Sequence, residues 1–224
     1  MKPKLGPHGL SIFFSVIFLL TLVGQAVSGV ALYNQQQLGS GLSPVSFLQY
    51  ITSSDFVVDV AENWQSEYLQ FFLLIGATIW LVQKGSPESS AIGTQGFESD
   101  EEQMVGAYIK PDSPTWAKAG GWRLAVFSNS LLIVMGLIFL LSWSAQSVAG
   151  LVQFNEEQLR NLEDPVSWLG YVSSPEFWNR TLQNWQSEFL AVGSMVTLSI
   201  FLRQRGSSES KPVGAAHAAT GVSG

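Results

Sequence analysis

The sequence predicts an all-α integral membrane protein, in which four transmembrane helices form two tandem, parallel two-helix repeats. Three observations predict this class: a low content of charge, an internal duplication and four apolar runs. Of the 224 residues, 46% are hydrophobic and 12% are charged, and an average soluble domain carries about twice that fraction of charge. Because so few charged groups cannot cover a soluble surface, we expect the lipid bilayer to cover much of it.

The duplication has no gap. Sliding the chain by 121 positions aligns Leu10–Ser90 with Leu131–Lys211, and about 30 of roughly 80 positions are then identical, against ~6% expected by chance. The shared strings include IFLL, PVS and NWQSE. We therefore divide the chain into a first membrane repeat (1–90), an acidic cytoplasmic connector (91–123), a second membrane repeat (124–211) and a disordered C-terminal tail (212–224).

Each repeat opens with a long apolar run and closes with a shorter one. The opening runs, Leu10–Leu32 and Leu124–Val152, are long enough to cross a hydrocarbon core of about 30 Å. The closing runs, Tyr68–Val82 and Phe189–Leu202, cover only about 22 Å as helices. If the closing helices cross the bilayer, the preceding NWQSE segment must lie within the outer boundary of the bilayer.

The basic residues set the orientation. Of the 11 lysines and arginines, only Arg160 and Arg180 fall in the loops between paired helices, and the other nine lie at the termini and in the connector. The positive-inside rule therefore predicts that both termini are cytoplasmic. Both repeats then insert in the same direction, related by a pseudo-two-fold axis along the membrane normal.

A secretory signal peptide is the alternative interpretation of the first run. Met1–Lys4 is basic, an apolar stretch follows, and Ala26–Ser28 resembles a cleavage site. We favour an uncleaved spanning helix, because the equivalent run of the second repeat lies in the middle of the chain.

Short interfacial helices are expected in the two external loops. Ser43-Pro44 and Asp164-Pro165 have the cap-then-proline pattern that begins a helix, and the apolar residues that follow suit the outer membrane surface. Ser174 is a second cap, with proline and an acid in the first turn. No helix-breaking residue follows before Gln204, so this helix is expected to run through to that position.

One polar constellation in the predicted spans occurs twice. Asn63 and Glu67 share a face of the second helix, as Asn184 and Glu188 do in the fourth. Glutamines at a similar depth in the first and third helices are expected to meet these faces. The candidate intramembrane polar site thus consists of Gln25, Asn63, Glu67, Gln146, Asn184 and Glu188.

Two interpretations of this constellation stay open. In the first, the polar side chains hold helices together through interhelical hydrogen bonds, of about 0.6–2 kcal/mol each. In the second, Glu67 and Glu188 line a path for protons or cations, because carboxylates in a membrane with no basic residue at their depth must find water, protons or polar partners. A path also needs a homo-oligomer, since four helices rarely enclose a pore, and we expect a homo-oligomer.

The composition argues against several other function classes. The chain has no cysteine, and its two histidines, His8 and His217, lie near the termini, so no metal site, cofactor site or catalytic pair is expected in the spans. A net charge of −6 argues against a nucleic-acid partner. The acidic run Glu98–Glu102 is expected to be a solvated cytoplasmic loop, and it identifies no protein partner.

The chain resembles a family of small bacterial membrane proteins known only as a domain of unknown function. The resemblance rests on AENWQSEYLQFF and QNWQSEFLAVGSM, on the SPES exit at Ser86–Ser89, and on Ser128-Asn129-Ser130 leading into LIVMGLIFLLSW. It implies family membership and a place in the bacterial inner membrane, and it brings no activity, ligand or catalytic residue.

The sequence therefore favours a non-enzymatic component of the bilayer, structural or stress-related. The alternative is a small ion or proton transporter or channel that uses Glu67 and Glu188.

Overall fold

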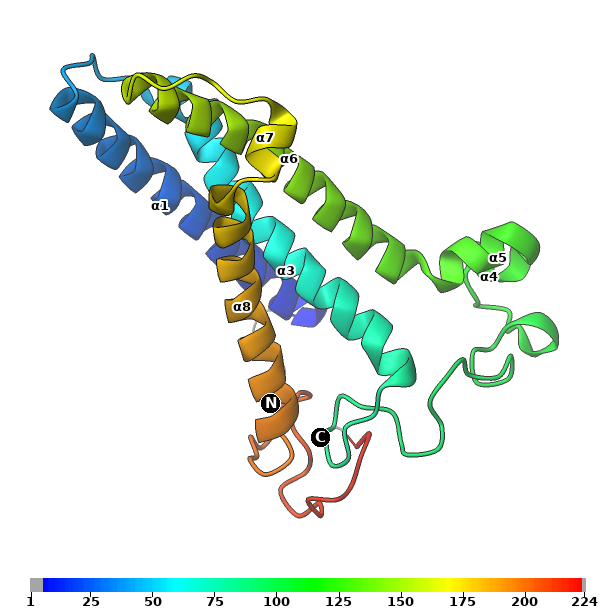
Figure 1. The fold of residues 1–224 in the computed structure, drawn as a ribbon. Helices are drawn as coiled ribbons and strands as arrows, with labels where there is room; N and C mark the ends of the chain where they lie inside the picture. The colour runs from blue at the N-terminus through cyan, green and yellow to red at the C-terminus, as the bar shows by residue number, and fades with distance from the viewer. Residues whose placement is uncertain (1–5, 223–224) are drawn as a thin grey trace. The chain divides into compact units, whose positions relative to one another are not determined.

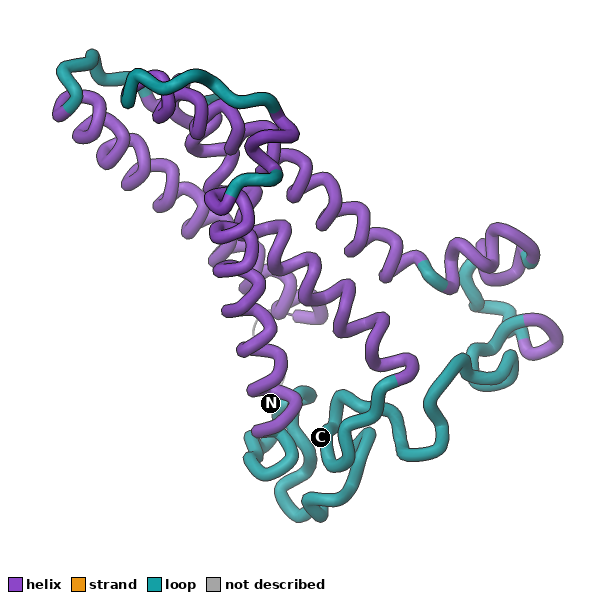
Figure 2. Tube along the Cα trace, in the orientation of Figure 1, coloured by secondary structure: helices purple, strands orange, loops and turns teal. Residues whose placement is uncertain are grey.

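The computed structural model describes residues 6–222, which form helices joined by turns and loops and no β-strand (Figures 1 and 2). The predicted all-α class is therefore confirmed for this part of the chain. The predicted cytoplasmic N-terminus with Lys2 and Lys4 lies outside the described residues. The elements are η1 (Gly6–His8), α1 (Gly9–Gly39), α2 (Phe47–Ile51), α3 (Ser54–Trp80), η2 (Gly106–Tyr108), α4 (Thr115–Ala119), α5 (Gly121–Ser128), α6 (Ser130–Arg160), α7 (Trp168–Val172) and α8 (Pro175–Leu198).

The chain divides into two compact units, each with segments from both predicted repeats. The first consists of Met1–Ala61 and Ala145–Val172, and the second of Glu62–Ser144 and Ser173–Gly224. The predicted boundaries of repeats, connector and tail stay a prediction, because a division by compactness does not test a division by sequence similarity.

Two of the described helices, α1 and α6, are long and apolar enough to cross a membrane. Each has 31 residues, about 46 Å of helix. The other long helices, α3 and α8, do not meet the same criterion, since both carry the polar NWQSE segment. Length and composition thus support two of the four predicted spans, and the spanning role of α3 and α8 stays a prediction.

In the first unit, an asparagine closes the turn after each opening helix in the same way. Asn34 donates from Nδ2 to the Val45 carbonyl (2.9 Å) and accepts the Val45 N–H at Oδ1 (2.7 Å). Asn155 makes the same two bonds to Val166, at 3.0 and 2.8 Å. Because one side-chain amide satisfies both backbone polar groups of a single residue, the turn has a defined geometry. The duplication seen in the sequence therefore extends to local structure.

A buried tyrosine on each short helix lies directly over a glycine of the long helix before it. Tyr50 of α2 covers Gly29 of α1, and Tyr171 of α7 covers Gly150 of α6, and a Cβ at either glycine would overlap the tyrosine hydroxyl. The rings are fixed by neighbouring aromatic side chains; for Tyr50 these are Tyr33 and Phe56. The glycines are thus needed for close approach.

The short helices of the external loops exist but begin later than predicted. Helix α2 begins at Phe47, because Ser46 caps it in a capping box with Gln49. The predicted starts at Ser43-Pro44 and Asp164-Pro165 are wrong by about one turn. The physical reason is the pair of hydrogen bonds from the asparagine side chain, which we call the asparagine clamp. The N–H and carbonyl of Val45 are already bonded to Asn34, so Val45 cannot take part in a helix.

The predicted run Leu124–Val152 is not one helix. It is interrupted at Asn129, between α5 and α6. The Asn129 side chain donates to the Ala125 carbonyl at 2.8 Å, and the Ser130 hydroxyl donates to the Phe127 carbonyl at 2.8 Å. Such side-chain bonds compete with the helical backbone pattern, and they end α5 before α6 begins.

The start of α8 is confirmed and its end is not. Ser174 caps the helix by accepting the Phe177 N–H, with Pro175 in the first turn. The helix ends at Leu198 instead of continuing to Gln204. A turn follows, and the Arg203 guanidinium donates to carbonyls near the helix end, including that of Ser199. Arginine at this position satisfies carbonyls that a longer helix would have used.

We expect Gly29→Ala and Gly150→Ala each to destabilise the protein by about 1–3 kcal/mol, because the added methyl group displaces a buried tyrosine ring. Gly24→Ala is the matched control, since Gly24 lies in α1 and an added Cβ would meet nothing within 4 Å, and alanine there favours the helix. Thermal unfolding in detergent measures all three variants. Equal midpoints for Gly29→Ala and Gly24→Ala would contradict the close-approach role.

Candidate functional site

The six predicted site residues are divided between the two units. Gln25 and Gln146 belong to the first unit, where Gln146 is buried and Gln25 half-buried. The two asparagines and two glutamates belong to the second unit. The predicted contacts of the glutamines with these residues stay predictions.

In the second unit, α3 and α8 present the shared NWQSE motif differently. Asn63 and Glu67 of α3 are exposed, whereas Asn184 and Glu188 of α8 are half-buried. The carboxylates of Glu67 and Glu188 are near enough to interact as like charges. The structure thus places the two copies of the motif in different environments.

The buried polar group of the motif in α3 is Gln65, which the candidate set does not include. Gln65 is fully buried, and its Oε1 accepts a hydrogen bond from Trp185 Nε1 of α8 at 2.6 Å. The signal that could have found it is its spacing: Ala61 and Leu69 lie four residues before and after Gln65 and are also buried. Small and apolar residues at this spacing mark the packed face of a helix.

An ion pair joins the same two helices about one turn nearer their N-terminal ends. Arg180 Nε of α8 lies 2.5 Å from the Glu62 carboxylate of α3, and Arg180 Nη1 lies 3.9 Å from Glu176. Both partners of the shorter pair are largely shielded from solvent. Arg180, one of the two basic residues in the predicted external loops, therefore has its charge balanced by carboxylates.

Aromatic side chains fill the space beside this contact. Trp143 of α6 stacks on Phe139 and Phe177, with ring centroids 5.6 and 6.1 Å apart, and also contacts Trp178 and Trp185. Aromatic pairs of this kind contribute beyond the burial of their area. Trp185 is therefore held in place by ring contacts while its N–H reaches Gln65.

At the far end of α3 and α8, the two repeats fold into equivalent exit turns. The Gln83 N–H donates to the Ser89 hydroxyl, and the Gln204 N–H to the Ser210 hydroxyl, both at 2.9 Å. Each turn carries a glutamate, Glu88 or Glu209. Burial, and secondarily the charge of Glu209, raise the pKa of Glu88.

A buried lysine ties the C-terminal segment to the first exit turn. Lys211 Nζ donates to the carbonyls of Gly85 (2.6 Å) and His217 (2.9 Å), and to those of Ala216 and Ala219. Burial lowers the pKa of Lys211. No pattern in the sequence indicated this contact, because the equivalent position in the first repeat is Ser90.

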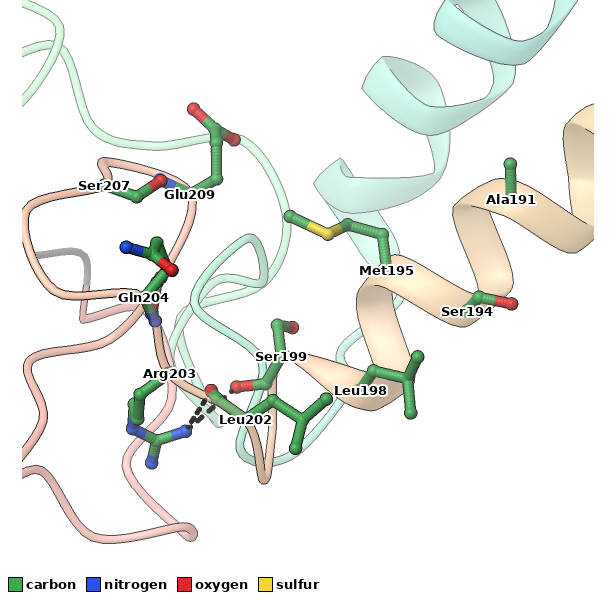
Figure 3. A pocket seen from close by; sticks show the side chains of 11 residues that line it. Ala191, Ser194, Met195, Leu198, Ser199, Leu202, Arg203, Gln204, Ser207 and Glu209 are labelled. Atoms are coloured by element: carbon green, nitrogen blue, oxygen red, sulfur yellow. Dashed lines mark hydrogen bonds between the residues drawn. The ribbon is translucent and has the colours of Figure 1, made fainter.

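An open pocket of about 450 Å³ lies at the end of α8 (Figure 3). Its wall is formed by residues of α8 from Ala191 onward and by the exit turn with Glu209. Arg203 also lies in this wall and donates from Nη1 to the carbonyls of Ser199 and Leu202. Since these donors serve the end of the helix, we interpret Arg203 as a helix cap.

Metal coordination is not supported in the part of the chain that the structure describes: no group of three or more histidine, aspartate or glutamate side chains there could hold an ion.

We expect Gln65→Met to lower the free energy of unfolding by about 1–3 kcal/mol, because it leaves the Trp185 N–H without its acceptor in a packed environment. Gln186→Met is the matched control: the same substitution at the same repeat position, but on an exposed residue, with an expected change within about 0.5 kcal/mol. Thermal unfolding in detergent compares the two. Equal losses of unfolding free energy in the two variants would show that the Gln65–Trp185 hydrogen bond does not stabilise the fold.

Comparison with known proteins identifies a family. Searches of the curated proteins and of the solved structures find no similar protein. The family model described as "Domain of unknown function (DUF6766)" matches residues 1–222. This match covers almost the whole chain and confirms the predicted membership of a family known only as a domain of unknown function. The chain therefore belongs to the DUF6766 family, whose function is unknown.

Proposed function

We propose that this protein is a non-enzymatic structural component of the bacterial inner membrane, with four spanning helices and cytoplasmic termini. The observation that carries the proposal is the hydrogen bond between Gln65 and Trp185. The NWQSE motif is the longest string that the two repeats share, and its buried amide holds one helix to another. A motif that joins helices in this way supports a structural role for the protein.

The lengths of α3 and α8 support four spans. They have 27 and 24 residues, about 40 and 36 Å of helix, enough to cross a core of about 30 Å. Their polar NWQSE segments then lie toward the outer boundary, and their apolar ends cross the centre.

The distribution of basic residues favours four spans over two. With four spans, nine of the 11 lysines and arginines are cytoplasmic and two are external. If only α1 and α6 crossed, Lys84, Lys110, Lys118 and Arg123 would be external, which leaves seven cytoplasmic and four external. Because cytoplasmic loops are enriched in basic residues, the four-span topology fits better.

A structural role also fits the use of the other polar groups. In the second unit, Arg180 pairs with Glu62, and Lys211 is bonded to backbone carbonyls. These contacts join helices or fix the C-terminal segment. Within the described residues, none of them brings a nucleophile to a base, which an enzyme would need.

A proton or cation path is the second candidate, and one observation favours it. The carboxylates of Glu67 and Glu188 interact as like charges, and paired carboxylates in a membrane are typical of ion-handling groups. Glu67 is exposed on the single chain, so such a path would need further chains to enclose it.

The topology can be tested with single cysteines, because the natural chain has none. With four spans, a membrane-impermeant maleimide added to spheroplasts should label Glu163→Cys but not Ser113→Cys until the membrane is permeabilised. With two spans the pattern is reversed. Ser40→Cys is the control, since both topologies place it outside. Labelling of Ser113→Cys in intact spheroplasts would refute the four-span proposal.

Flux measurements separate the structural role from the path. In proteoliposomes, a structural component is expected to give proton and cation fluxes equal to protein-free vesicles, and Glu67→Gln/Glu188→Gln should leave both flux and unfolding midpoint unchanged. Flux in the wild type that disappears in a folded double variant would instead establish the path and its groups. Asn63→Ala/Asn184→Ala serves as a control for polar residues without a titratable proton.

A further inference from the structure

The pocket at the end of α8 has a counterpart at the end of α3. That second pocket has a volume of about 210 Å³, and nine of its lining residues lie 121 positions before nine residues that line the larger pocket. We call the two cavities the exit pockets. They therefore belong to the repeated unit and not to one helix end alone. Five of the nine paired positions are identical in both copies: Leu81/Leu202, Gln83/Gln204, Ser86/Ser207, Glu88/Glu209 and Ser89/Ser210.

The larger exit pocket has an apolar side and a polar side. Helix α8 contributes Met195 and Leu198, which are 41 and 51% exposed. The exit turn that follows contributes Gln204, Ser207 and Glu209, which lie together beside the pocket (Figure 3). The lining thus changes from apolar to polar in the direction in which α8 runs.

The polar side offers a carboxylate to a ligand. Glu209 is exposed, and its Oε1 accepts a hydrogen bond from the Ser208 hydroxyl at 3.0 Å. In the described part of the chain, no basic side chain forms an ion pair with it. Arg203 lies in the same wall, but its terminal nitrogens are bonded to backbone carbonyls, including those of Ser199 and Ala215. A ligand with a cationic group would therefore complement this side.

The groups around Glu209 favour a cation with an anion beside it. Glu88, the equivalent residue of the other exit pocket, interacts with Glu209 as a like charge, and a cation at this position reduces the repulsion. Next to the carboxylate, the Gln204 amide is exposed. The Ser207 hydroxyl accepts the Glu209 N–H at 3.2 Å and keeps its own proton for donation. Both side chains can therefore donate to an anionic group.

We propose that the larger exit pocket binds a phospholipid with a primary ammonium headgroup, a phosphatidylethanolamine, from the cytoplasmic leaflet. One acyl chain lies along Met195 and Leu198. The ammonium group pairs with Glu209, and the phosphate accepts hydrogen bonds from Gln204 and Ser207. A primary ammonium is a hydrogen-bond donor to the carboxylate, which a trimethylated ammonium is not.

The order of the groups selects a lipid over a soluble ligand. The inference rests on the proposed four-span topology, in which α8 runs from the outer boundary toward the cytoplasm. The apolar side of the pocket then lies at the depth of the acyl chains, and the exit turn lies at the depth of the headgroups. A lipid of the cytoplasmic leaflet has the same order from tail to headgroup. An anionic lipid without an ammonium group would bring no cation to Glu209.

Competition between lipids tests the headgroup side of the site in the full chain. Native mass spectrometry in mild detergent measures retention of dioleoyl phosphatidylethanolamine against equal amounts of dioleoyl phosphatidylglycerol or phosphatidylcholine. We expect phosphatidylethanolamine to be retained at least about fivefold over phosphatidylglycerol, as for one charge pair at a membrane surface, and more strongly than phosphatidylcholine. Glu209→Gln should abolish the preference over phosphatidylglycerol. Glu101→Gln is the matched control, since it makes the same change on an exposed residue of the connector, and it should keep the preference.

A second pair of variants tests the apolar side. Ala191→Trp places an indole ring in the wall of the pocket and should lower the retention of phosphatidylethanolamine to that of phosphatidylglycerol. Leu190→Trp is the control, because Leu190 is 67% exposed and does not line the pocket. Unfolding midpoints equal to that of the wild type show that each variant is folded.

Three results would overturn the proposal. They are wild-type retention that does not depend on the headgroup, a preference that persists in Glu209→Gln, and equal retention by Ala191→Trp and Leu190→Trp. A homo-oligomer that dissociates in Ala191→Trp with its lipid preference unchanged would show instead that a second copy covers the pocket. A failure of the four-span topology shows separately, in the labelling of Ser113→Cys, because that readout does not depend on lipid binding.

Discussion

The structure of the second unit depends on one buried amide. Gln65 lies fully enclosed on α3, and a buried amide without partners costs about 1–3 kcal/mol. Trp185 supplies a donor from α8 to the Gln65 oxygen at 2.6 Å, and this bond joins the two helices at that height. The aromatic side chains around Trp143 and the Arg180–Glu62 pair then fit that register.

The duplication is preserved where contacts are local and modified where helices meet. The asparagine clamps, the tyrosines over glycines and the exit turns occur twice with nearly equal distances. Each of these contacts is made within one repeat, so each copy keeps it independently. By contrast, Arg180 stands where the first repeat has an acid, Asp59, and it pairs with a glutamate of the other repeat. The copies thus differ at positions where they touch each other.

The sequence predicted where helices form and where they are capped better than it predicted which face of each helix is buried. Apolar runs located α1 and α6, and the cap at Ser174 was correct because serine, proline and an acid make a strong local signal. The break at Asn129 and the late start of α2 were missed because each depends on a particular side-chain bond to the backbone. Asn63 and Gln65 are equally polar residues of NWQSE, and only the four-residue spacing of Gln65 from the apolar Ala61 and Leu69 indicates that Gln65 is the one on the buried face.

The same reasoning explains why duplicated residues have different roles. An isologous contact would use Gln65 and Gln186 in the same way, and both would then be buried. Gln65 is buried, whereas Gln186 is exposed. Gln65 accepts a hydrogen bond from Trp185 within the second unit, so the same residue type contributes to packing in one copy of the motif and lies at the surface in the other.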